Sequence, residues 1–440
     1  MAIAALDSRL AGPAAALSTI DLLRLSTAGS VDDGKSTLIG RLLYETKSIF
    51  EDQLEAIERA SLRQGADQLN LALLTDGLRA EREQGITIDV AYRYFATPRR
   101  KFIIADTPGH VQYTRNMVTG ASTSDLALIL VDARNGVVEQ SRRHALLASL
   151  LGVRQLLVCV NKMDLVGYAR EAFEQVRDEF SSFATGLGTA NVAFIPVSAL
   201  YGDNVIEPSA NMEWYDGPAL LPYLEAVPAG SNAGEAGFRF PVQWVVRPMS
   251  NEHHDYRAYA GQIGSGRVQP GDEVLVLPLG KTTRIRAIDT YDGSLDSAAA
   301  PLSVSLLLED DLDVSRGDML CDPFSPPSSS QDVEAMVCWF SETPLNPNGR
   351  YTIRHTTRKA RALVTGIDYR LDTNTLQRDT DVRGLNLKLN DVGRLRLRTT
   401  QPLLWDEYRR NRVTGSFILA DEGTNSTVAA GMILPPGEDW

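Results

Sequence analysis

The chain has 440 residues, of which 43% are hydrophobic and 23% are charged, and its formal net charge is −12. This composition is typical of a globular protein with about three domains. The acidic balance argues against broad binding to nucleic acid or to acidic membranes. No apolar run approaches about 18 residues, so we expect no membrane span. The scattered cysteines predict neither a disulfide framework nor a zinc site, and they favour the reducing cytoplasm.

Apolar runs alternate with helical patterns between residues 22 and 226. The stretches 139–151 and 170–183 have the spacing of helices. Near-continuous hydrophobicity, which is typical of strands covered on both faces, marks the runs 22–28, 101–105, 125–131, 155–160 and 191–197. This series predicts a mostly parallel sheet flanked by helices, and such sheets bind ligands at the carboxyl ends of their strands.

Two polar stretches, 228–237 and 323–331, read as linkers. Beyond the first linker, short β-type runs are punctuated by turns, which predicts two small β-barrels. The alanine-rich N-terminus has no signal-peptide pattern and reads as a loose tail. The expected division is therefore a tail at 1–20, an α/β domain at 21–228, and β-barrel domains at 236–323 and 331–440.

A phosphate-loop pattern, G-x-x-x-x-G-K-[ST], follows the first predicted strand and precedes a helical spacing. Its glycines let successive N–H groups surround a polyphosphate, and the helix N-terminus adds partial positive charge. Lys35 can reach the terminal phosphates, and Ser36 can place its hydroxyl on Mg²⁺. A chance glycine-rich turn is the alternative. The residues of the loop are Gly29, Ser30, Val31, Asp32, Asp33, Gly34, Lys35, Ser36 and Thr37.

A second motif follows the strand 101–105. Its carboxylate, Asp106, can hold Mg²⁺, usually through a water, and the Gly109 N–H can approach a γ-phosphate. The alternative is a simple turn, for which this residue pattern is common. The motif consists of Asp106, Thr107, Pro108, Gly109 and His110.

A third motif follows the strand 155–160 and consists of Asn161, Lys162, Met163 and Asp164. The Asp164 carboxylate can accept hydrogen bonds from guanine N1–H and N2–H₂, whereas adenine presents an acceptor at N1. Asn161 can join this base loop to the phosphate loop, and the Lys162 stem can pack on the base. A polar turn after a buried strand is the alternative.

Weaker signals complete the predicted site. The backbone of Ser198 and Ala199, after the strand 191–197, could meet guanine O6. Thr87 lies in the long charged stretch 75–89, and its hydroxyl could join Mg²⁺ while a γ-phosphate is present and leave after hydrolysis. That behaviour would make the stretch a switch. A charged surface loop is the alternative.

Together these motifs resemble the translation-factor class of GTPases, which includes elongation factor Tu. Gly-Ile-Thr-Ile at 85–88 is a further mark of that class. Asp33, where elongation factors carry histidine, and the stretches 78–95 and 136–144 more narrowly resemble the GTPase subunit of the bacterial two-subunit sulfate adenylyltransferase. The resemblance covers about residues 20–435. It implies a multidomain fold: an α/β P-loop GTPase domain followed by two β-barrel domains.

The resemblance implies roles for these residues in binding and hydrolysing GTP. The phosphate loop would hold the phosphates, with Ser36 and Thr87 on Mg²⁺ and Asp106 in its outer shell. His110 would position the attacking water behind an apolar gate of Val31 and Ile86. The implied catalytic residues are Lys35, Thr87 and His110, and the chemistry is positioning and charge stabilisation.

The resemblance also implies a partner, a smaller ATP-binding adenylyltransferase subunit in a heterodimer or larger assembly. That subunit would form adenylylsulfate and pyrophosphate from ATP and sulfate, an uphill reaction that GTP hydrolysis would drive. Some relatives carry a fused adenylylsulfate kinase, an activity that we do not expect here. No membrane or nucleic acid is expected as a partner.

Two other functions stay open from the sequence. One is an elongation factor that delivers aminoacyl-tRNA, and the other is a free regulatory GTPase with no second reaction. Asp32, Asp33 and the stretch 78–95 favour the sulfate adenylyltransferase subunit over an elongation factor. The two predicted barrels count against a free GTPase, because they imply a large docking surface.

Replacing Asp164 by Asn should weaken GTP binding and admit xanthosine triphosphate, because an amide group donates where the carboxylate accepts. Competition between the two nucleotides for the purified chain measures this change. An unchanged base preference would refute the assignment of Asp164 to guanine.

Overall fold

The computed structural model describes residues 21–49, 54, 55, 57, 69, 71–74, 87, 89–188, 191–229, 237–248, 256–381 and 386–438. The chain divides into two compact units, Met1–Gly230 and Ser231–Trp440. Within these described ranges, no helix is both long enough and apolar enough to cross a lipid bilayer.

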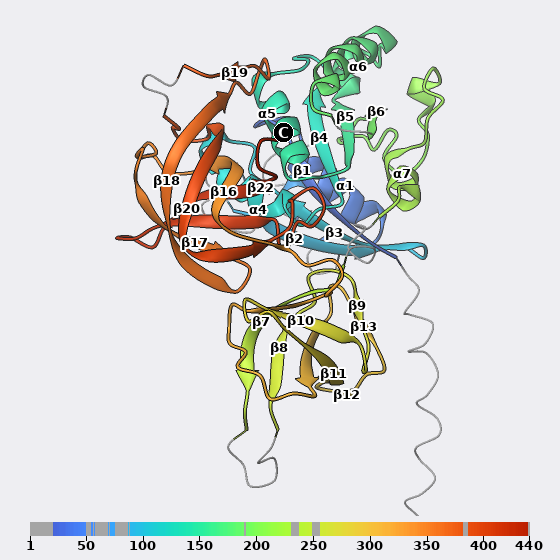
Figure 1. Ribbon diagram of the computed structural model, residues 1–440. Coiled ribbons are helices and arrows are strands. Elements are labelled where there is room, and N and C mark those ends of the chain that lie inside the picture. The colour runs from blue at the N-terminus through green and yellow to red at the C-terminus, as the bar shows by residue number, and fades with distance from the viewer. Residues whose placement is uncertain are drawn as a thin grey trace, which may run out of the picture. The chain divides into compact units, whose positions relative to one another are not determined.

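The first unit is built on a six-stranded sheet in the order β2-β3-β1-β4-β5-β6 (Figure 1). Each of the runs predicted as a strand from near-continuous hydrophobicity forms one. These strands pair in parallel, whereas the edge strand β2 pairs antiparallel with β3. The strands are β1 (Asp21–Ala28), β2 (Ala91–Ala96), β3 (Arg100–Asp106), β4 (Leu126–Asp132), β5 (Gln155–Asn161) and β6 (Asn191–Pro196).

Helices connect these strands and include the two that the sequence predicts. The α-helices are α1 (Lys35–Glu45), α4 (Thr114–Ala121), α5 (Glu139–Leu150), α6 (Arg170–Thr185) and α7 (Leu220–Ala226). Short 3₁₀ turns are η2 (Leu71–Leu74), η3 (Val111–Tyr113), η4 (Met163–Val166) and η5 (Ala210–Met212).

The two faces of the sheet have separate helical covers. Leu126, Leu128 and Leu130 of β4 share a buried cluster with Leu38 of α1 and Leu224 of α7. Because side chains alternate along a strand, the intervening residues of β4 face the opposite side. There α4 contacts β1 and β3, and α5 contacts β4. Both faces of the central strands are therefore buried, which explains their unbroken hydrophobicity.

The second unit begins with a closed antiparallel barrel in the order β10-β15-β7-β8-β14-β11, in which β10 also pairs with β11. A short strand, β12, extends it, and β9 and β13 form a separate pair. The bounds are β7 (Arg239–Val246), β8 (Ala258–Gln262), β9 (Arg267–Val268), β10 (Glu273–Leu277), β11 (Lys281–Thr290), β12 (Gly293–Ser294), β13 (Ala298–Ala299), β14 (Ser303–Leu308) and β15 (Met319–Cys321).

A second barrel follows in the order β17-β21-β22-β16-β20-β18, closed by pairing of β17 with β18 and extended by β19. Its strands are β16 (Ser328–Trp339), β17 (Arg350–His355), β18 (Arg358–Leu371), β19 (Arg378–Asp379), β20 (Val392–Trp405), β21 (Ser416–Asp421) and β22 (Thr427–Leu434). The prediction that 323–331 is wholly a linker is wrong. Ser328 to Ser330 pair with the end of β20. Their side chains are polar, so the sequence gives no hydrophobic signal for this strand pairing.

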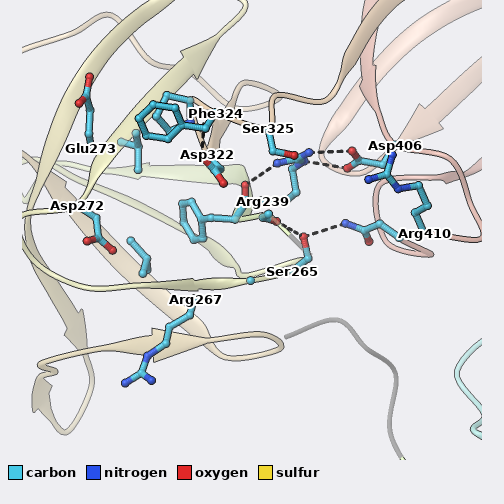
Figure 2. Close-up of a pocket in the computed structure, with 17 residues that line it drawn as sticks. Arg239, Ser265, Arg267, Asp272, Glu273, Asp322, Phe324, Ser325, Asp406 and Arg410 are labelled. Atoms are coloured by element: carbon cyan, nitrogen blue, oxygen red, sulfur yellow. Dashed lines mark hydrogen bonds and ion pairs between the residues drawn. The ribbon is translucent and has the colours of Figure 1, made fainter. Parts of the chain in front are cut away.

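A buried ion pair joins the two barrels within the second unit. Arg239 of β7, which is 4% exposed, donates to both carboxylate oxygens of Asp406 at 2.9 Å (Figure 2). The Thr414 hydroxyl also donates to Asp406, and the Asn411 amide donates to Ser265 Oγ. Loss of one member of such a buried pair costs about 3–5 kcal/mol. A cavity of about 660 Å³ lies beside this pair, and none of the predicted site residues lines it.

Candidate nucleotide-binding site

The motifs predicted from the sequence lie at one edge of the six-stranded sheet. Strands β1, β3, β4 and β5 run parallel, and their last residues are Ala28, Asp106, Asp132 and Asn161. The phosphate loop and the two later motifs therefore begin at the carboxyl ends of their strands. Ligands of open α/β sheets bind at this edge.

The phosphate loop runs from the end of β1 to the first turn of α1. Gly34, directly before the helix, has a φ angle of 90°, a left-handed conformation that favours glycine. A Cβ atom there would lie 2.5 Å from Asn161 Nδ2, so a larger residue would displace that amide. The Leu38 N–H donates to the Gly34 carbonyl at 2.9 Å. The N–H groups of the first turn lack such partners and are available to an anion.

The polar groups of the phosphate loop bind one another. The Lys35 ammonium, on a side chain that is mostly buried, donates to the carbonyl oxygens of Gly29 at 2.9 Å and Ser30 at 2.8 Å. The Ser30 N–H donates to Asp33 Oδ2 at 2.6 Å. Among the described residues, the buried Ser30 Oγ has no hydrogen-bond partner. An anion that replaced these acceptors would find several donors already directed at one place.

Burial changes the ionisation of two groups in the loop. It lowers the pKa of Lys35, against the opposing effect of Asp106 and Asp33. It also raises the pKa of Asp33, although the hydrogen bond from the Ser30 N–H opposes this shift. Both directions follow from the cost of holding a charge away from water. A phosphate beside Lys35 would offset that cost for the ammonium group.

The second motif is anchored to β1 and pressed against the phosphate loop. Asp106 is buried and accepts a hydrogen bond from the Thr27 hydroxyl at 3.1 Å. The Thr107 hydroxyl donates to the Thr27 carbonyl at 2.5 Å. A Cβ atom at Gly109 would lie 2.4 Å from Lys35 Nζ. It would also lie 2.4 Å from the Gly29 carbonyl oxygen, and because a backbone atom cannot move aside as a lysine side chain can, this position favours glycine.

His110 lies half-buried at the end of this motif. Its Nδ1 atom accepts a hydrogen bond from the Gln112 N–H at 3.3 Å, and its ring centroid lies 6.0 Å from that of Tyr113. Val31, one side of the predicted apolar gate, is 39% exposed. Ile86, the other side, lies outside the described residues. The gate and the catalytic role of His110 therefore stay predictions.

The oxygen donors predicted for Mg²⁺ are of the kind that this ion prefers. Ser36 is half-buried in the first turn of α1, and Asp106 is buried at the end of β3. Thr87 is half-buried, but Ile86 and Ile88 on either side lie outside the described residues, so its approach to Ser36 stays a prediction. Hydroxyl and carboxylate oxygens suit this hard cation. The described residues contain no cluster of three His, Cys, Asp or Glu side chains.

Asn161 joins the base loop to the phosphate loop. It is 1% exposed, and its Nδ2 donates to the Asp33 carbonyl at 2.8 Å. Its Oδ1 accepts from the Ala199 N–H at 3.0 Å. The Asn161 side chain thus connects the end of β5 to residues that follow β1 and β6. Met163, two residues after Asn161, is fully buried, which fixes the turn that leads to Asp164.

The other polar groups of the base loop also have partners. The Ser198 hydroxyl donates to Asp164 Oδ1 at 2.6 Å. Lys162 Nζ lies 3.0 Å from Asp132 Oδ2. Burial alone would raise the pKa of Asp132, but hydrogen bonds from Arg134 and Lys162 lower it to about 2. The sequence analysis missed Asp132, although it directly follows the predicted strand 125–131 as the other site residues follow theirs.

Replacing Asn161 by Ala would leave the Asp33 carbonyl and the Ala199 N–H without this partner. We expect the free energy of unfolding of the first unit to fall by about 2–6 kcal/mol, since each of the two buried groups left unpaired costs about 1–3 kcal/mol. We also expect weaker binding of guanine nucleotides. Scanning calorimetry and nucleotide titration of the full chain measure both effects. Asn191→Ala, at an exposed position that starts β6, is the control, and equal behaviour of the two variants would contradict the bridging role.

Two family models match the chain. Residues 21–229 match the elongation factor Tu GTP binding domain. Residues 332–434 match the GTP-eEF1A C-terminal domain-like family. The first match covers the whole sheet and all the motifs described above, and the second covers most of the second barrel. The first unit is therefore a GTP-binding domain of the elongation factor Tu type.

Relatives that match most of the chain, and not only its first unit, identify the family more specifically. The chain is 59% identical over 414 residues to the bifunctional enzyme CysN/CysC of Mycobacterium tuberculosis, covering 94% of this chain and 67% of that protein. It is 51% identical over 422 residues to sulfate adenylyltransferase subunit 1 of Bacteroides thetaiotaomicron, and the match covers 94% of this chain and 86% of that protein. It is 50% identical over 416 residues to the protein of the same name from Alteromonas mediterranea, and the match covers 94% of this chain and 87% of that protein. The chain belongs to the family of sulfate adenylyltransferase subunit 1.

Proposed function

We propose that this chain is the GTP-hydrolysing subunit of a sulfate adenylyltransferase. A smaller ATP-binding partner forms adenylylsulfate and pyrophosphate from ATP and sulfate, and GTP hydrolysis in this chain drives that uphill reaction in sulfate assimilation. The observation that carries the proposal is the 51% identity to sulfate adenylyltransferase subunit 1 across 94% of the chain. Because both nucleotides are cytoplasmic metabolites, the proposed location is the cytoplasm.

Guanine selectivity is assigned to the base loop. The Asp164 carboxylate would accept the N1–H and N2–H₂ groups of guanine, and the Ser198 hydroxyl that donates to it at 2.6 Å would hold it in place. The Ala199 N–H already donates to Asn161, so the Ser198–Ala199 turn is fixed beside Asp164. Adenine would present an acceptor to this carboxylate where guanine presents donors, which is costly in a partly buried site.

Phosphate binding is assigned to the loop from Gly29 to Thr37. Lys35 would exchange two carbonyl acceptors, which lie 2.9 and 2.8 Å away, for phosphate oxygens. This exchange replaces neutral acceptors with charged ones, which form shorter and stronger hydrogen bonds. Ser30, whose buried hydroxyl has no partner among the described residues, offers a further donor.

Mg²⁺ would be held by Ser36, Thr87 and, through a water, Asp106. When bound, it would offset the negative charge on the phosphates of GTP. The buried Asp106 carboxylate, fixed by the Thr27 hydroxyl at 3.1 Å, supplies the negative charge on the protein side. Release of Thr87 after the γ-phosphate leaves would free the stretch 75–89, which is the proposed switch.

Hydrolysis is assigned to His110, which would orient the attacking water toward the γ-phosphate. Its Nδ1 atom accepts the Gln112 N–H at 3.3 Å, which leaves Nε2 as the nitrogen that can face a water. Gly109, whose peptide lies against the Gly29 carbonyl and the Lys35 ammonium of the phosphate loop, would place its N–H near the γ-phosphate. Such positioning is the main protein contribution in phosphoryl transfer.

The direct test reconstitutes the chain with a candidate small subunit, ATP, sulfate and GTP, and measures pyrophosphate and inorganic phosphate. We expect pyrophosphate release to depend on GTP. His110→Ala should slow GTP hydrolysis about 100-fold, the lower range of effect for loss of a general acid–base group, and should slow GTP-dependent pyrophosphate release equally. GTP binding should persist.

Asp178→Asn is the control, because this side chain of α6 is 70% exposed. It should leave both rates unchanged. If wild-type chain gives no GTP-dependent pyrophosphate, the sulfate adenylyltransferase assignment fails. If His110→Ala hydrolyses GTP at the wild-type rate, only the role of His110 fails.

A further inference from the structure

Helix α5 contributes a polar pair that contacts the second motif. Gln140 and His144 are four residues apart and therefore lie on the same face of the helix. Gln140 Nε2 lies 3.1 Å from the Gly109 carbonyl oxygen and 2.9 Å from His144 Nε2. His144 is 2% exposed. The Gly109 carbonyl is thus linked through one amide to a buried imidazole.

The hydrogen-bond chemistry fixes the protonation of this pair. A carbonyl oxygen only accepts, so the Gln140 atom that faces Gly109 must be its NH₂ group. The second N–H of that group then meets His144 Nε2, which must accept. His144 is therefore neutral with its proton on Nδ1, and Nδ1 has no hydrogen-bond partner among the described residues. Burial first, and then the charges of Lys35 and Arg143, lower the pKa of His144 to about 3, which agrees with the neutral form.

Holding a buried histidine in this way has a cost. A buried donor without a partner costs about 1–3 kcal/mol. The residues that follow His144 on α5, Ala145, Leu146 and Leu147, are buried and apolar. Among the described residues, the hydrogen bond of the His144 ring leads to Gln140 and, through it, to Gly109. The unpaired Nδ1–H of His144 costs stability, and the hydrogen bond that holds Gln140 against Gly109 is what the buried histidine provides in return.

The peptide that Gln140 holds lies at the reaction centre of the proposed function. Its carbonyl belongs to Gly109 and its N–H to His110, so a hydrogen bond to the carbonyl restricts rotation of the whole plane. On the other side, Gly109 packs against Lys35 Nζ and the Gly29 carbonyl, with a Cβ atom excluded at 2.4 Å. The peptide is thus fixed between the phosphate loop and α5.

We propose that Gln140 and His144 are a positioning pair for GTP hydrolysis, which hold the Gly109–His110 peptide so that the His110 side chain faces the attacking water. The inference rests on the proposed function of this site. His144 orients Gln140, Gln140 orients the peptide, and the peptide orients His110. Their effect therefore falls on the chemical step rather than on nucleotide binding.

The first test replaces Gln140 by Met, which keeps the length of the side chain and removes its donors. Single-turnover GTP hydrolysis by the full chain with its partner subunit should slow about 10- to 100-fold, the scale on which misplaced catalytic groups reduce rates. KM for GTP and the affinity for GDP should stay near their wild-type values. Glu139→Gln, at a 61% exposed position one residue earlier on α5, is the matched control and should keep the wild-type rate.

The second test compares His144→Gln with His144→Met. The two replacements have similar size, but only glutamine offers an acceptor near the place of Nε2. We expect His144→Gln to retain most of the wild-type rate and His144→Met to lose as much as Gln140→Met. A role in packing alone would affect both replacements equally.

The outcomes separate this inference from the function on which it rests. If the wild-type chain hydrolyses no GTP, both the proposed function and the positioning pair are wrong. Wild-type hydrolysis with an unchanged rate in Gln140→Met overturns the positioning pair alone, as does a loss confined to GTP affinity. Equal rates in His144→Gln and His144→Met overturn the role of His144 as an acceptor.

Discussion

The site depends on one buried amide, that of Asn161, which holds three loops in register. It joins the phosphate loop to the base loop through Asp33 at 2.8 Å and to the turn after β6 through Ala199 at 3.0 Å. A Cβ atom at Gly34 would lie 2.5 Å from the same amide nitrogen, so a larger residue there would displace it. A ligand that touches both loops therefore meets groups whose spacing is set before it arrives, which reduces the entropy lost on binding.

Buried charge is the second constraint on the site. Lys35, Asp33, Asp106 and Asp132 are all less than about a tenth exposed, and each has a partner of opposite polarity close by. Charges held away from water interact more strongly with an incoming ion than exposed charges do. The same burial raises the pKa of Asp33 and lowers that of Lys35, so an anionic ligand would stabilise the charged lysine.

Much of this arrangement could be predicted from the sequence, because the relevant signals are local. Strands covered on both faces are continuously hydrophobic, and each motif directly follows such a strand. The edge strand β2 was missed because its short run, Ala91–Ala96, is interrupted by Arg93 and follows the charged stretch 75–89, so it lacks the continuous hydrophobicity of the central strands. Gln140 and His144 lie in the stretch 136–144 that resembles the GTPase subunit. Only the contact of Gln140 with Gly109, which is distant in the sequence, points to a role for them at the site. Tertiary contacts of this kind leave no local pattern.

Isothermal titration of the nucleotide-free chain tests the central claim most directly. We expect GTP and GDP to bind at a single site per chain and ATP not to compete, because Asp164 would pair with guanine and would repel the adenine N1 acceptor. Binding of ATP as tightly as GTP would contradict the guanine assignment. Absence of heat with both guanine nucleotides in large excess would contradict the site itself.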